Sequence, residues 1–176
     1  MKHFYLLPII LIICYCNGKR SGEKEVERFN MTHQIDSLET KIYENEIKDI
    51  PNEQLTRLMI SSYEGYANLF HEDTISAQYL YNAARLYENV LRDNSKAANL
   101  YGRVYESYPT YSKHSFMLFA MGNAYHSLGD TSKAVEIFNK FINEYSTNEF
   151  ADDAKGMIKF MRMTKDEVDQ MFNTNK

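Results

Sequence analysis

Apolar and small side chains recur at helical spacing through the segment 118–145, on both sides of a Gly129-Asp130 turn. Residues three and four apart share one face of a helix, so each half of the segment predicts an amphipathic helix. Gly129 accepts the positive φ that ends a helix, and Asp130 can cap the helix that follows. The segment therefore predicts an antiparallel helical hairpin. Its apolar and small positions are Leu118, Met121, Gly122, Tyr125, Ala134, Phe138 and Phe141.

The small residues of this hairpin indicate where its two helices cross. Two short helices approach closely only where side chains are small, and Gly122 and Ala134 supply such positions on the two halves. Tyr125, Phe138 and Phe141 are expected to fill the space beside them.

A second copy of the pattern lies upstream, in the segment 79–109. Both second helices open with Ser-Lys-Ala, and the alanines of these two runs, Ala97 and Ala134, are 37 residues apart. The turn of the earlier copy, Arg92-Asp93-Asn94, is one residue longer and contains no glycine. Because a single hairpin cannot bury its apolar face alone, recurrence predicts a stacked array. The packing positions of the earlier copy include Ala84, Tyr87, Ala97 and Tyr101.

This series of positions resembles the tetratricopeptide repeat (TPR), with serine at Ser146 where the family has its closing proline. The resemblance implies an all-α fold in which TPR-like antiparallel helical hairpins stack in a short right-handed solenoid. Large, small, aromatic and glycine positions of the repeat are matched by Leu118, Gly122, Tyr125, Gly129, Ala134 and Phe138.

Four segments are expected to make up the array. Residues 32–72 predict an atypical opening hairpin, with helices over 32–48 and 52–70 that Pro51 separates. Residues 73–110 form a TPR-like repeat and residues 111–147 a full repeat. Residues 148–176 predict a partial repeat and a C-terminal capping helix. In that last segment, Asn148 is a candidate N-cap, and Thr164 and Glu167 have capping-box spacing.

The first 16 residues read as a lipoprotein-type signal segment. Lys2 precedes an apolar run, Phe4 to Ile13, that is too short to span a bilayer. Cys16 stands where a bacterial lipoprotein carries its acylated cysteine, so we expect lipidation there; an uncleaved short anchor and plain secretion are the alternatives. Residues 17–31, charged and nearly free of apolar side chains, predict a flexible tether.

Within the TPR class, the helix ends at Tyr108-Pro109 and Tyr145-Ser146 and the Ala-Asp-Asp-Ala run at 151–154 resemble envelope lipoproteins. That branch includes TPR lipoproteins of the outer-membrane assembly machine, the Tol–Pal coordinator type and single-domain lipoproteins of Bacteroidota. The resemblance implies an exported protein at the outer membrane or in the periplasm, held by a lipid anchor.

The sequence offers no pattern for catalysis, a cofactor or a metal. It contains no HExxH, GxSxG, phosphate-loop or GxGxxG motif. His114 and His126 are 12 residues apart on one expected helix, more than three turns, so they cannot share a metal. A net charge of −4 gives no broad nucleic-acid footprint. We therefore expect a protein that is not an enzyme and needs no cofactor.

A binding role follows from the expected architecture, because the first helices of stacked repeats line a concave groove. The side chains that packing leaves free there are Asn82, Arg85, Asn123 and His126, with Glu88 or Asn89 and Phe119 as further candidates. Amide and guanidinium groups can bond a peptide backbone or a carboxylate, although such residues also occur on ordinary solvated helix faces.

These features predict a protein–protein interaction scaffold that binds a partner peptide or helix in its groove. The alternatives are an accessory subunit of an outer-membrane assembly or division complex, docking through the convex face, and a glycan-handling accessory protein.

Overall fold

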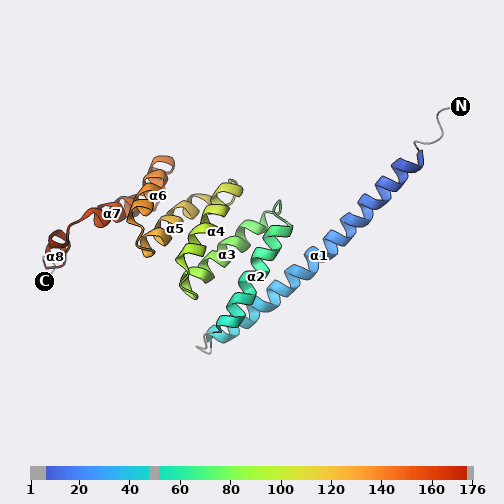
Figure 1. Cartoon of the computed structure of the whole chain (residues 1–176), viewed down its shortest axis with the longest axis horizontal. Coiled ribbons are helices and arrows are strands. Elements are labelled where there is room, and N and C mark those ends of the chain that lie inside the picture. The colour runs from blue at the N-terminus through green and yellow to red at the C-terminus, as the bar shows by residue number, and fades with distance from the viewer. Residues whose placement is uncertain (1–6, 48–51, 174–176) are drawn as a thin grey trace. The chain divides into compact units, whose positions relative to one another are not determined.

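The computed structural model describes residues 7–47 and 52–173, and every regular element within these ranges is an α-helix (Figure 1). The predicted all-α fold is therefore confirmed. The helices are α1 Leu7–Ile47, α2 Glu53–Leu69, α3 Ile75–Asn89, α4 Asn94–Ser107, α5 His114–Ser127, α6 Thr131–Glu144, α7 Ala151–Arg162 and α8 Lys165–Asn173.

The chain divides into two compact units, the first ending at Phe70 and the second beginning at His71. In the first unit, α2 packs beside the C-terminal part of α1 (Figure 1). The Tyr63 hydroxyl of α2 donates a hydrogen bond to the Glu39 carboxylate of α1 over 2.5 Å. The buried side chains of this helix pair include Ile35, Leu38, Met59, Ile60 and Tyr63.

The N-terminal region differs from its predicted conformation. Residues 17–31, expected to be a flexible tether, belong to the single helix α1, which also begins well before the expected start at residue 32. The physical reason is composition: Glu, Lys and Arg favour helices, and Arg28 pairs with Glu25 one turn away at 3.4 Å. A charged segment without proline can thus remain helical, although it contains Gly18 and Gly22.

Part of the expected signal segment lies outside the described residues, namely residues 1–6. The backbone of residues 7–16 belongs to α1, but the side chain of Cys16 is outside the described part of the chain. Neither described range contains a helix with the length and apolar character needed to cross a membrane.

In the second unit, α3 to α6 follow one another as alternating antiparallel helices (Figure 1). Equivalent aspartates cap both second helices: Asp93 accepts from the Lys96 amide at 3.1 Å and Asp130 from the Lys133 amide at 3.0 Å. Gly129 has φ of 76° in the later turn. The earlier turn, which lacks glycine, places Arg92 at φ of 55° instead. In both hairpins, the turn after the first helix therefore contains a residue in the left-handed backbone conformation.

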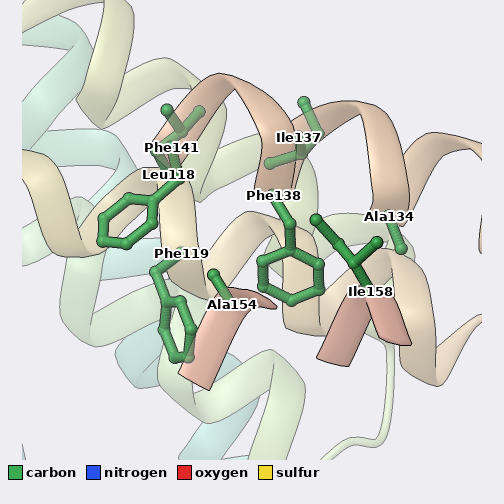
Figure 2. Packing of buried hydrophobic residues seen from close by; sticks show 8 residues of the cluster. All are labelled: Leu118, Phe119, Ala134, Ile137, Phe138, Phe141, Ala154 and Ile158. Carbon is green, nitrogen blue, oxygen red and sulfur yellow. The ribbon is translucent and has the colours of Figure 1, made fainter. Parts of the chain in front are cut away.

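The core of the later hairpin joins α5, α6 and α7 (Figure 2). Phe138 of α6 is fully buried beside Phe119 of α5, with ring centroids 5.6 Å apart. A Cβ added at Gly122 would lie 2.8 Å from the Phe138 ring, so the helices cross where this side chain is absent. The clustered residues are Leu118, Phe119, Ala134, Ile137, Phe138, Phe141, Ala154 and Ile158.

The other predicted packing positions are distributed as follows. Ala84, Ala97 and Tyr101 are buried, whereas Tyr87 and Tyr125 are half-buried. Gly129 is exposed, as its turn position requires.

At the C-terminal end, the capping-box prediction is confirmed and the N-cap prediction is wrong. The Thr164 amide donates to the Glu167 carboxylate at 2.7 Å, and the Glu167 amide donates to the Thr164 hydroxyl at 3.4 Å. By contrast, α7 begins at Ala151, and Asn148 accepts from the Phe150 amide at 3.0 Å. Asn148 thus forms a turn two residues ahead of the helix, because its side chain bonds locally rather than to the first helical turn.

Candidate functional site

The predicted groove residues lie on the first helices of the two repeats, α3 and α5. Arg85 is exposed, and Asn82, Asn123 and His126 are half-buried. The Asn82 side chain accepts a hydrogen bond from the Gln78 amide at 2.7 Å, so part of its capacity is used within its own helix. Asn82 is therefore partly engaged within α3, whereas partner contact through Arg85, Asn123 and His126 stays a prediction.

Two cations lie over the ring of Tyr81. The Lys113 ammonium is 4.5 Å and the Arg85 guanidinium 5.9 Å from its centroid. Both distances fall within the range of cation–π attraction. Tyr81 itself is only 9% exposed, so the ring acts as a fixed platform that holds both positive groups at this face.

From Tyr81, aromatic rings continue across the first helices. Tyr81 of α3 meets Phe116 of α5 edge-on at 6.4 Å, and Phe116 lies 5.3 Å from Phe150, just before α7. Phe116 and Phe150 are half-buried, so part of each ring faces solvent. We call Tyr81, Phe116 and Phe150 the aromatic row; Tyr81 is buried, so Phe116 and Phe150 form its solvent-facing part.

Phe119 does not belong to the solvent-facing part of the aromatic row, although the sequence suggested it as a groove residue. It is 8% exposed and stacks on Phe150 with centroids 5.0 Å apart. Its ring also contacts Phe138 and Phe141 in the core, each at 5.6 Å. Phe119 therefore supports the aromatic row from below.

Polar bonds fix the spacing of successive first helices. The Tyr111 hydroxyl donates to the Gln78 side-chain oxygen at 2.8 Å, and the Asn148 amide donates to the Ser115 hydroxyl at 3.3 Å. Burial, with the charge of Tyr81 as the second cause, raises the pKa of Tyr111 to about 12. Tyr111 thus stays protonated, and able to donate, across the physiological range.

Glu88, another groove candidate, is occupied by packing inside its own repeat. Its carboxylate accepts from the Tyr101 hydroxyl of α4 at 2.7 Å. Burial first, and then this carboxylate, raise the pKa of Tyr101 far above its ordinary value. The pair joins α3 to α4, and Arg85 is the charged residue of this part of α3 that lies over the ring of Tyr81.

A second polar cluster joins α4, α5 and α6 and has a structural character. His114 Nε2 lies 2.9 Å from the Tyr105 carbonyl oxygen and therefore carries the hydrogen, while Nδ1 accepts from the Tyr145 hydroxyl at 2.9 Å. The Tyr105 hydroxyl donates to the Glu144 carboxylate. Burial, followed by that bond, raises the pKa of Tyr105 well above its usual value. Both ring nitrogens of His114 thus form hydrogen bonds within the fold.

A metal site would need several ligating side chains that converge on one point. Within the described ranges, no group of three or more His, Cys, Asp or Glu side chains converges as a metal site would require.

The sequence analysis missed Lys113, Phe116 and Phe150. A signal for the aromatics existed: Phe116 and Phe150 are 34 residues apart, each near the start of a first helix, and Tyr81 precedes Phe116 by 35. This spacing is close to the repeat period. Lys113 lies in the turn before α5. Its position over Tyr81 depends on how α3 and α5 pack, so helical spacing along the sequence could not reveal it.

Comparison with known families gives one match. Residues 78–111 and 117–148 each match the model of the tetratricopeptide repeat, which confirms two repeats built from α3–α4 and α5–α6. No curated protein matches the chain.

Proposed function

We propose that this protein is a non-enzymatic scaffold that binds a peptide or helix of a partner protein along the face formed by α3, α5 and the start of α7. Tetratricopeptide repeats generally mediate protein–protein interaction through such faces. The observation that carries the proposal is the aromatic row, whose half-buried Phe116 and Phe150 continue from Tyr81 beneath two cations.

The chemistry of this face describes the partner segment. Apolar side chains of the partner would cover Phe116 and Phe150, since half-buried rings gain most from losing their remaining contact with water. Arg85 would pair with an acidic side chain or terminal carboxylate. Asn123 and His126 would bond the partner backbone. The favoured partner segment is therefore apolar at its centre and acidic at one end.

Location forms the finer part of the proposal. The protein is lipid-anchored at Cys16 and works in the bacterial cell envelope, at the outer membrane or in the periplasm. The support is the short apolar run Phe4 to Ile13, which is followed by Cys14 and Cys16 and then by a charged segment. The helical conformation of residues 17–31 would make the connection to the anchor a rod instead of a flexible chain.

Site-specific photo-crosslinking tests the binding face. A photo-reactive residue at position 123 is compared with one at position 143, an exposed site on α6. The proposal expects partner adducts from position 123 and few from 143. Adducts from 143 alone would favour an accessory subunit that docks through the second helices. Retention of the unmodified protein on glycan, with no protein adduct from either site, would favour a glycan-handling role.

A further inference from the structure

The N-terminal part of α1 carries an apolar surface that nothing covers within the described residues. Phe29 is 66% and Val26 60% exposed, the highest values among the large apolar side chains that the structure describes. They are three residues apart and share one helix face. Lys24 and Arg28 point elsewhere, since their charged groups lie 5.8 and 5.2 Å from the Phe70 ring centroid of α2. The face with Phe29 is thus directed away from the α1–α2 packing.

Acidic residues border this apolar surface. Glu23 lies one turn before Val26 and Glu25 one turn before Phe29, and both are exposed together with Glu27. Glu25 is paired with Arg28 at 3.4 Å, so Glu23 and Glu27 are the other exposed carboxylates of this segment. We call residues 23–29 the head face.

The last two helices of the described chain, α7 and α8, form a pocket of complementary character. It is an open depression of about 470 Å³ between α7 and α8, and it is lined by Lys155, Ile158, Lys159, Arg162, Met163 and Glu167. Its apolar surface comes from Met163, which is half-buried, and from the small exposed part of Ile158, which is otherwise in the core. Three cations and one carboxylate complete the lining. We call this the tail pocket.

The arrangement of these charges suits a helix with several carboxylates. Lys155, Lys159 and Arg162 follow one side of α7 over about 10 Å, at 1.5 Å per residue, which is too spread for one small anion. Lys155 is partly engaged by Asp152 at 2.7 Å, and Glu167 is held by the Thr164 amide. Lys159 and Arg162 therefore carry most of the attraction for an acidic partner.

We propose that the head face of one copy docks into the tail pocket of a second copy. Phe29 would lie against Ile158 and Met163, with the head-face carboxylates near Lys159 and Arg162. Both surfaces occur on the same chain and match in apolar character and opposite charge. Such a contact is heterologous, because it joins different patches of the two copies, and it can therefore extend into rings or open chains. This assembly is independent of the partner bound by the first-helix face.

Two variants of the full chain test the contact by sedimentation velocity over a concentration series. The head variant is Val26→Ser with Phe29→Ser, and the tail variant is Lys159→Ala with Arg162→Ala; all four side chains are exposed in part or whole. The native chain should increase in mass with concentration, and each variant should associate at least tenfold more weakly. Mixed together, the variants should form a 1:1 dimer that does not grow, because only one intact head–tail pair remains.

Matched control variants test whether any loss of positive charge, or of an exposed apolar side chain, is enough to weaken association. Arg57→Ala with Lys133→Ala removes two exposed positive charges elsewhere, and Leu58→Ser removes an exposed apolar side chain; both should associate like the native chain. Helical circular dichroism and melting verify that all variants are folded. A native chain that stays monomeric, variants that associate normally, or a mixture that stays monomeric would each overturn the proposal. Docking of a foreign acidic helix instead would appear as a monomeric native chain.

Discussion

Replacing Gly122 by alanine tests how the two helices of the later repeat pack. The added Cβ would lie 2.8 Å from Cε1 and 3.0 Å from Cδ1 and Cζ of Phe138. Carbon atoms attract best at roughly 3.5–4.0 Å, so the ring or a helix must move by nearly 1 Å. Phe138 is fully buried beside Phe119, which leaves the ring no free space to enter.

Two opposing terms set the size of the effect. Alanine is favoured over glycine inside a helix by about 0.8–1.0 kcal/mol. Overpacking a well-filled core costs typically about 1–3 kcal/mol. Because three ring atoms are too close at once, we place Gly122→Ala in the upper part of that range and expect a net loss of about 1–2 kcal/mol.

Gly156 provides the matched control. It lies inside α7, and a Cβ there would meet nothing within 4 Å. Gly156→Ala should therefore stabilise the protein by up to about 1 kcal/mol, the propensity term alone. The same substitution is thus expected to have opposite signs at the two sites.

Urea unfolding followed by far-ultraviolet circular dichroism measures both variants. Adding Phe138→Leu to Gly122→Ala gives a double-mutant cycle, in which the smaller side chain should recover part of the loss. If Gly122→Ala stabilises the protein as Gly156→Ala does, or if the cycle shows no coupling, the close crossing at Gly122 is refuted.

Three further predictions concern a turn, a tyrosine and the N-terminus. Arg92→Gly should stabilise the protein by roughly 0.5–1 kcal/mol in urea unfolding, since a non-glycine residue at φ of 55° is strained; unchanged stability would contradict this. Because the folded chain raises the Tyr111 pKa from 10.0 to about 12, its contribution to stability is present below pH 10 and is lost as the pH rises to about 12. The free energy of unfolding of Tyr111→Phe should therefore fall less steeply between pH 10 and 12 than that of the native protein. An equal slope would show that Tyr111 is not the cause of the fall. Intact mass of protein purified from membranes should show loss of residues 1–15 and added acyl chains, absent in Cys16→Ser; a full-length unmodified mass would contradict lipidation.

The repeat core was largely predictable because its determinants are local. Gly122 and Ala134 mark the crossing, Gly129 and Asp130 mark the turn, and each acts within a few residues of chain. Even Arg92 follows from the pattern once the missing glycine of the earlier turn is noticed. Helix spacing and capping chemistry therefore sufficed for the hairpins.

The N-terminal segment and the binding face were harder to predict for different reasons. Charged composition suits both a solvated coil and an exposed helix, and ion pairs such as Arg28–Glu25 contribute too little to be decisive from sequence alone. For the face, helix periodicity showed that Arg85 lies outside the core, but not that Lys113 joins it over Tyr81. Glu88 and Phe119 were offered as groove residues because their packing partners lie outside their own helices: Tyr101 is on α4, and Phe150 lies just before α7.

The affinity of a crosslinked partner for variants of the first-helix face tests the central proposal most directly. Arg85→Ala with Asn123→Ala is compared with Asn99→Ala and Asn143→Ala, a pair of exposed positions on α4 and α6. Loss of one charged and one neutral hydrogen bond, about 1.5–3 and 0.5–1.5 kcal/mol, predicts binding weakened by more than tenfold in the first variant. The second should bind like the native protein. Unchanged binding by the Arg85 and Asn123 variant, with loss in the other, would place the partner on the second helices and contradict the account.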